Sequence, residues 1–105
     1  MLINKSTKIE AGDIITLKLA NGDEIVGELV SESDYGFLLN RPMAAVMTGQ
    51  GLGLMQAMFS VDPKGKYEIS KNHVMMHGQT FDTVKKHYLS SVSDIAVLTK
   101  GDFRH

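Results

Sequence analysis

The sequence has no cysteine, no tryptophan and only two prolines among its 105 residues. Without cysteine the chain has no disulfide framework, no zinc–thiolate site and no thiol nucleophile. This absence fits an intracellular protein, and a cytoplasmic location is expected. The chain also has no long apolar run, so neither a signal peptide nor a membrane-spanning segment is expected.

The chain also has no large excess of charge of either sign, because its net charge is only −1. Such a chain has no overall attraction for a polyanion. Residues 1–40 carry three lysines and seven acidic residues, whereas residues 71–105 carry five basic residues, three acidic residues and four histidines. A polyanion-binding surface is therefore expected in the C-terminal third. An ordinary solvated surface with chance unevenness would give the same counts.

The stretch from residue 12 to residue 42 predicts three consecutive β-strands. Apolar residues alternate with polar ones over residues 15–19, which is the pattern of a half-buried strand. The Asn-Gly pair at 21–22 is typical of a tight hairpin turn. Gly27 interrupts the second apolar run, and a glycine inside a strand marks a bulge or a bend. A small, strongly curved sheet or barrel is expected.

A methionine-rich segment follows at residues 43–59 and includes four methionines. Its centre, residues 48–51, has the composition of a turn. We expect a long hairpin in which residues 43–47 extend the third strand and residues 53–61 form the fourth. Because methionine adapts readily to partner surfaces, the arms are interpreted as a subunit interface. Plain core packing is the alternative.

The last third predicts short extended runs and then a helix. Residues 67–69 and 74–76 are strand-like, with a polar turn between them. A helix is predicted over residues 80–92, with Thr80 as its N-cap. Its apolar face is formed by Phe81, Val84, Tyr88 and Val92. A tail would follow at 93–105, and residues 94–98 form either a short strand or part of that extended tail.

The meander resembles the first motif of the Sm-like (LSm/Hfq-type) family of RNA-binding ring proteins. The matching residues are Leu19-x-x-Gly22 and Gly27-x-Leu29, followed by an acidic turn and the third strand, with an aromatic residue at Tyr35. The second family motif is a short polar turn between the last two strands. In this chain it resembles Ile69-Ser70-Lys71-Asn72-His73-Val74, and a competing register would place it at residues 74–78.

The resemblance implies a single domain over residues 1–105. This domain would be a five-stranded antiparallel Sm-like barrel with its core at 13–78, carrying the long hairpin and the helix as additions. It also implies a cyclic homo-oligomer that binds single-stranded RNA near subunit boundaries. The implied RNA-binding residues are Asp34, Tyr35, Lys71, Asn72 and His73.

Each implied role has an ordinary structural alternative. Tyr35 is also a common strand former with a half-buried ring, and Lys71-Asn72 is also a common solvated turn. His73 and His77 are four residues apart, too far along a strand to clasp one ion, so no metal site is expected. No nucleophile–base pair is evident, so neither catalysis nor a cofactor is expected.

Two hypotheses therefore follow from the sequence. In the first, the chain is an Sm-like ring that binds RNA through stacking and polar turn residues. In the second, the same barrel serves as an assembly or scaffold protein through its methionine-rich hairpin, without RNA. Salt separates the two, because phosphate contacts weaken steeply with salt whereas apolar association persists.

Overall fold

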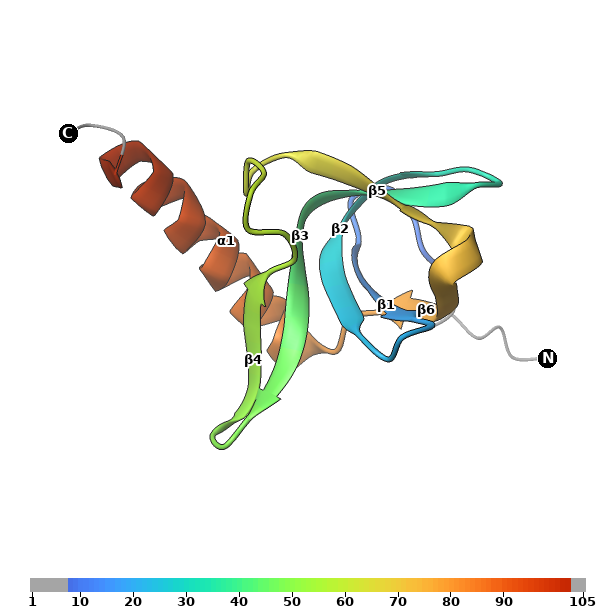
Figure 1. Ribbon diagram of the computed structural model, residues 1–105, viewed down its shortest axis with the longest axis horizontal. Helices are drawn as coiled ribbons and strands as arrows, with labels where there is room; N and C mark the ends of the chain where they lie inside the picture. The colour runs from blue at the N-terminus through green and yellow to red at the C-terminus, as the bar shows by residue number, and fades with distance from the viewer. Residues whose placement is uncertain (1–7, 103–105) are drawn as a thin grey trace.

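Six strands and one α-helix make up this computed structural model, which describes the backbone of residues 8–102 and the side chains of residues 8–93 (Figure 1). The strands are β1 (Ile14–Leu19), β2 (Glu24–Glu32), β3 (Gly36–Thr48), β4 (Gly51–Gln56), β5 (Lys66–Ser70) and β6 (Val74–Gln79). The short 3-10 helix η2 (Lys71–His73) joins β5 to β6, and α1 (Asp82–Asp102) follows β6. The expected mostly β chain with one helix after the last strand is confirmed.

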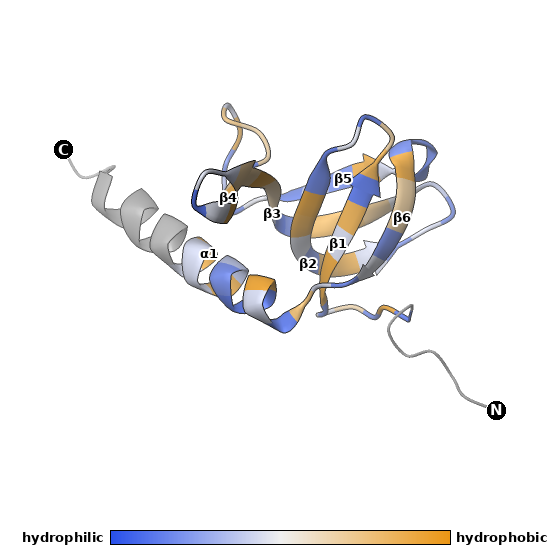
Figure 2. Ribbon diagram, turned by 90° about the horizontal axis from the view of Figure 1, so that it is seen from below, coloured by the Kyte–Doolittle hydropathy of each residue, from blue (hydrophilic) through white to orange (hydrophobic). Residues whose placement is uncertain are grey.

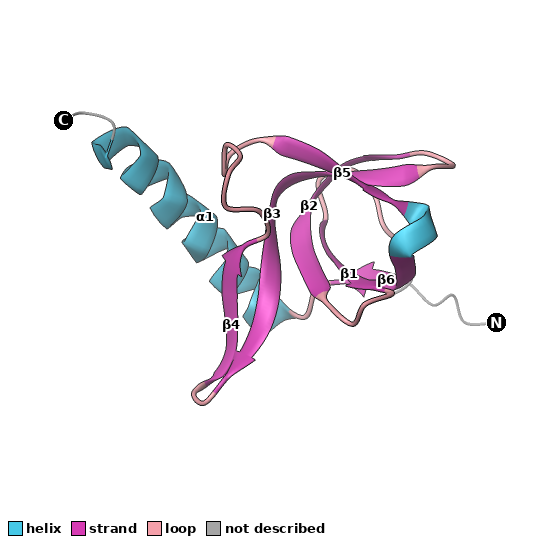
Figure 3. Cartoon of the chain, in the orientation of Figure 1, coloured by secondary structure: helices cyan, strands magenta, loops and turns pink. Residues whose placement is uncertain are grey.

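All the strands form one antiparallel sheet, in the order β4-β3-β2-β1-β6. One edge of β3 pairs with β2, while its other edge pairs with β5 over residues 36–40 and with β4 over residues 43–48. Figure 3 shows the sheet curling round so that η2 spans from β5 to β6. Within residues 8–102 no ladder joins β5 to β6, so the sheet is curled but not closed by hydrogen bonds.

Two glycines act as the sequence analysis predicted. Gly22 has a φ of +97° in the turn between β1 and β2, where the Asn21 side chain accepts a hydrogen bond from the Asp23 N–H. Gly27 lies at a register shift between β2 and β3. A side chain there would meet Leu39 at 3.1 Å, so glycine allows the strands to cross closely and curl.

The curled sheet has an apolar core on each face. Its inner core consists of Ile15, Leu17, Ile25, Leu29, Phe37 and Leu39. The outer core joins strands β1, β2 and β3 to the helix and consists of Ile14, Val26, Met43, Tyr88 and Val92. The alternation of Ile14 and Ile15 between the two cores follows from the two-residue period of a strand. Figure 2 shows these apolar stripes along the strands.

Helix α1 is attached where β3 changes partners. The Tyr88 hydroxyl lies 3.0 Å from the Asn40 carbonyl oxygen and 2.9 Å from that of Arg41. Arg41 has a φ of +50°, a left-handed conformation that is uncommon for a residue with a side chain. Burial raises the pKa of the Tyr88 phenol above its ordinary value of 10.0, although the charge of Arg41 partly opposes this shift.

The helix differs from its predicted limits. It runs from Asp82 to Asp102 rather than over 80–92, so most of the predicted tail at 93–105, including the strand or extended segment at 94–98, is helical. Residues 103–105 lie outside the described residues.

Thr80 precedes the helix by two residues and is not its N-cap, because its hydroxyl instead contacts that of Thr16 at 2.8 Å. Phe81 lies before the helix and is exposed, so it does not belong to the buried face.

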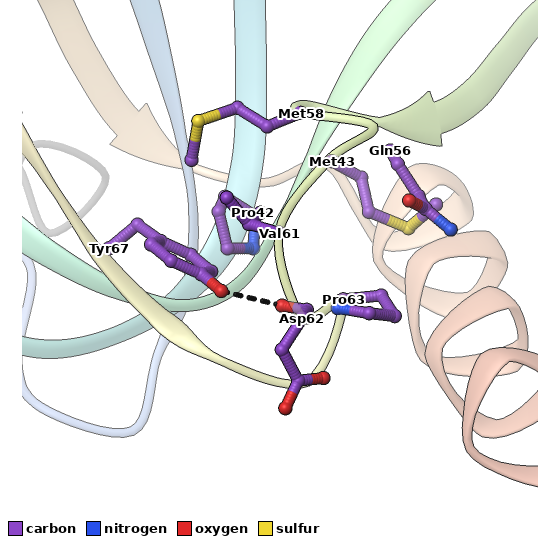
Figure 4. A pocket seen from close by; sticks show the side chains of 8 residues that line it. All are labelled: Pro42, Met43, Gln56, Met58, Val61, Asp62, Pro63 and Tyr67. Carbon is purple, nitrogen blue, oxygen red and sulfur yellow. Dashed lines mark hydrogen bonds between the residues drawn. The ribbon is translucent and has the colours of Figure 1, made fainter. Parts of the chain in front are cut away.

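The strand number and the hairpin also need correction. The resemblance implied five strands, whereas the sheet has six, because the predicted hairpin strand, β4, is present in addition to β5 and β6. This strand ends at Gln56 rather than continuing over 53–61. The chain then loops back, held by a hydrogen bond from the Tyr67 hydroxyl to the Asp62 carbonyl (Figure 4). The Arg41 N–H donates to the Gly65 carbonyl and ties the loop to the bend in β3.

Replacing Tyr88 with phenylalanine is expected to lower the free energy of unfolding by about 1–2 kcal/mol, because a part-buried hydrogen bond is lost. The raised pKa means that the unfolded chain releases this proton first. The stabilising contribution of the hydroxyl is therefore complete below pH 10.0 and declines as the pH rises further.

Urea unfolding at neutral and alkaline pH measures both effects. Tyr67→Phe is the matched control, since its hydroxyl bond is solvent-exposed and a smaller loss is expected. Equal losses in both variants, or a Tyr88→Phe loss that does not change above pH 10.0, would contradict the anchoring role.

Candidate nucleic-acid interface

Tyr35 and Lys71 are brought together at one end of the curled sheet. The Lys71 N–H donates to the Tyr35 carbonyl at 2.8 Å, although the two residues lie in separate turns. The side chain of Tyr35 is 82% exposed, so the alternative of a half-buried ring at the start of a strand is wrong. Its ring is free to present a face to a ligand, as base stacking requires.

The turn that carries Tyr35 is organised by Ser33. The Ser33 hydroxyl accepts hydrogen bonds from the N–H groups of Tyr35 and Gly36, at 3.1 and 3.2 Å. Serine at the first position of a turn commonly satisfies the backbone in this way. Asp34 stands exposed in the same turn, beside Tyr35. The first two predicted site residues therefore share one short, polar turn between β2 and β3.

The other predicted residues lie on η2. The Ser70 hydroxyl accepts a hydrogen bond from the Asn72 N–H at 3.2 Å, and both Asn72 and His73 have exposed side chains. The Ala20 N–H donates to the His73 carbonyl at 2.8 Å, which ties the end of η2 to the turn after β1. The polar turn expected between the last two strands is thus present. The competing register at 74–78 falls inside β6, so the turn lies at 71–73.

Lys71 is held by a residue that the sequence analysis did not select. Its ammonium nitrogen lies 2.7 Å from the Glu32 carboxylate and 5.2 Å from the centre of the Phe37 ring. Glu32 is at the end of β2 directly opposite Phe37, so the β2–β3 ladder sets its position. The sequence offered only a weak signal for this pair, because Glu32 and Lys71 are 39 residues apart.

A groove of about 250 Å³ opens beside this ion pair. It is lined by Glu32, Phe37, Lys71, Val74, Met75, Met76 and His77. The His77 ring lies against Phe37, with ring centres 5.2 Å apart and planes tilted by 53°. Such tilted contacts between rings are favourable. His77 was considered only as a metal ligand or a part of the competing register, and its place in this groove was missed.

Two other hollows, of about 360 and 350 Å³, are larger, and both are lined in part by Lys18 and Glu24. The cavity drawn in Figure 4 holds only about 10 Å³, which is the space of a single water. Among the described residues, no group of His, Cys, Asp or Glu is arranged to hold a metal ion. No helix in the described part of the chain is long and apolar enough to cross a membrane.

The arrangement combines an exposed aromatic residue, one ammonium group, two carboxylates, the Asn72 side-chain amide and the His73 ring. Such a set suits a planar ligand with its own donors and acceptors better than a bare anion.

Comparison with protein-family models gave no match for this chain, and a search of curated proteins gave none either. We therefore infer the function of this chain from the geometry of its site.

Gly36 is the residue that allows the two turns to meet. A Cβ at this position would lie 2.8 Å from the Ile69 carbonyl oxygen and 2.9 Å from the Glu68 side chain. Gly36→Ala is therefore expected to push β5 away from β3 and to lower stability by about 1–3 kcal/mol.

Thermal or urea unfolding measures this change. Gly49→Ala is the matched control, because a Cβ there meets nothing within 4 Å and stability should stay close to that of wild type. Equal stability of the two variants would show that β3 and β5 are not in close contact at Gly36.

Proposed function

We propose that this chain is an Sm-like protein that forms a ring of identical copies and binds single-stranded RNA. The observation that carries the proposal is the backbone hydrogen bond between Lys71 and Tyr35, which joins a turn with an exposed aromatic residue to a turn with a lysine. Single-stranded nucleic acid is bound by this combination, because every base has a face to stack and every nucleotide has a phosphate.

Each site residue has a physical role in this proposal. Tyr35 stacks on an unpaired base, a contact worth about 1–3 kcal/mol. Lys71 donates to a base edge or a phosphate, and Asn72 and His73 donate to or accept from neighbouring base edges. Asp34 repels phosphate but accepts from a base N–H. Binding, rather than catalysis, is the activity proposed for this set.

The order of the elements supports the Sm-like part of the proposal. Three strands form a meander with a bend at Gly27, β6 returns to pair with β1, and a short polar turn separates β5 from β6. The meander and the polar turn are features that the resemblance implied, and the pairing of β6 with β1 is a finding of the structure. The β4 arm and α1 are additions to that arrangement.

Free edges of the sheet support the proposed ring. Within residues 8–102, β5 pairs only with β3, and β6 pairs only with β1. Each strand therefore has a free edge, and free edges are ready to pair with another chain. Joining β5 of one copy to β6 of the next pairs both edges. A constant rotation between copies closes such a contact into a ring.

A second candidate function is supported by the exposed apolar side chains of the hairpin and its following loop. Met47 is 77% exposed and Phe59 is 76% exposed, with Leu52, Met55 and Met58 exposed as well. Apolar side chains gathered in this way mark contact sites for other proteins. In this alternative the chain is an assembly or scaffold protein and does not bind RNA.

Fluorescence anisotropy with short labelled U-rich and A-rich RNAs tests the first function. Tyr35→Ala is expected to weaken binding by about tenfold or more, because a stacking contact is lost. Lys71→Ala is expected to weaken it as well. The matched controls are Phe81→Ala, another exposed aromatic residue, and Lys64→Ala, another exposed turn lysine, and neither should change binding.

Light scattering after size exclusion is run on the same samples to give the assembly mass. An intact ring that binds neither RNA at low salt would contradict the RNA-binding function and favour the scaffold. Losses of equal size in the control variants would show that Tyr35 and Lys71 are not the site.

Substitution of Met47 by lysine separates the two modes of assembly. If copies join through the edges of β5 and β6, the assembly mass measured by light scattering is expected to be unchanged, because Met47 lies near the tip of the hairpin. If the hairpin is the interface, a buried charge there would break the assembly into smaller species. Lys64→Ala again serves as the surface control.

A further inference from the structure

The groove beside Lys71 carries no excess positive charge. Its lining includes one lysine and one glutamate, and the two are in direct contact at 2.7 Å. Both side chains remain partly open to solvent, with exposed fractions of 33% for Lys71 and 37% for Glu32. A ligand entering this groove therefore meets an ammonium group and a carboxylate side by side, within reach of one small molecule.

A phosphate is a poor occupant of this groove. To contact Lys71 it would have to approach the Glu32 carboxylate, which carries the same sign of charge. It would also have to compete with a charge-assisted hydrogen bond that is already made. The position of Glu32 thus removes Lys71 from the set of ordinary phosphate contacts.

The edge of an unpaired base suits the pair, because a base offers donors and acceptors without charge. A carboxylate only accepts hydrogen bonds and an ammonium only donates them. The Watson–Crick edge of guanine presents two neighbouring donors, N1–H and the N2 amino group, beside the O6 acceptor. This edge can donate to both carboxylate oxygens and accept from the ammonium at the same time, and no other common base has such an edge.

We propose that Glu32 is a specificity-determining residue that converts Lys71 from a phosphate contact into a reader of an unpaired guanine. Glu32 accepts from N1–H and N2, while Lys71 donates to O6. The base lies along the groove wall formed by Met75, Met76 and the exposed His77 ring. A volume of about 250 Å³ is below that of a pocket for a drug-sized ligand and suits one base. This inference rests on the proposed RNA binding and names what that site selects.

The test compares two labelled U-rich RNA hexamers that differ only in one central nucleotide, guanosine or inosine. Inosine has the same ring and the same O6 but lacks the N2 amino group. Wild-type protein is expected to bind the guanosine oligomer about tenfold more tightly, because a hydrogen bond to a charged group is lost with inosine. The Glu32→Gln variant is expected to bind the two oligomers with nearly equal affinity.

Inorganic polyphosphate, which has no bases, is the third ligand. Glu32→Gln frees Lys71 and is expected to bind polyphosphate more tightly than wild type does. Its RNA affinity should also fall more steeply with salt, with a slope steeper by about 0.7 for one added phosphate contact. Glu24→Gln is the matched control, because Glu24 also lies on β2 and pairs with a surface lysine, Lys18, at 3.4 Å. It should keep the guanosine preference of wild type and gain less polyphosphate binding than Glu32→Gln does.

Thermal melting of the two glutamine variants confirms that both are folded before binding is measured. If wild type binds both oligomers equally, or if Glu32→Gln keeps the guanosine preference, the inference is overturned while RNA binding stands. If wild type binds neither oligomer at low salt, both the inference and the proposed function are overturned. A gain in polyphosphate binding by Glu24→Gln equal to that of Glu32→Gln would also overturn the specific role of Glu32.

Discussion

The bend in β3, held by the Tyr88 hydroxyl, is the constraint on which the rest of the structure depends. One strand has to serve two partners on the same edge, β5 before the bend and β4 after it. Arg41 turns the chain with a positive φ, and such a conformation persists only when its surroundings hold it. Tyr88 supplies that support from the helix, and the Gly65 carbonyl supplies it from the loop. The candidate site lies on one side of this bend and the apolar hairpin on the other.

Electrostatic balance distinguishes the candidate site from a simple cationic groove. The acidic N-terminal half contributes Glu32 and Asp34, and the more basic C-terminal part contributes Lys71. Because Glu32 and Lys71 form an ion pair across the sheet, the site is nearly neutral even though it joins two oppositely charged parts of the chain. A neutral site with donors and acceptors favours selection by hydrogen bonding over capture by charge. Recognition by hydrogen bonding does not require a large positive charge, so it is compatible with the net charge of −1.

Local patterns in the sequence predicted the strands well where the periodicity was clear. Residues 15–19 and the Asn21-Gly22 turn fall where expected, and the register shift occurs at Gly27. Prediction failed at Thr80, because the capping signal of a threonine was outweighed by its contact with Thr16 across the sheet. It failed as well at the end of the helix, which continues to Asp102. It failed also for the end of β4, which stops at Gln56 and is followed by a loop in which the Tyr67 hydroxyl donates to the Asp62 carbonyl.

The sequence by itself determined the alternating strands, the tight turns and the apolar helix face, since these depend on neighbours within a few residues. It also placed Lys71 in a polar turn and Tyr35 directly after one. Only the tertiary structure decided that these turns touch, that Tyr35 is exposed, and that Glu32 pairs with Lys71. The physical reason is that these contacts join segments 36 to 39 residues apart, and no local pattern encodes which side chains meet when the sheet curls.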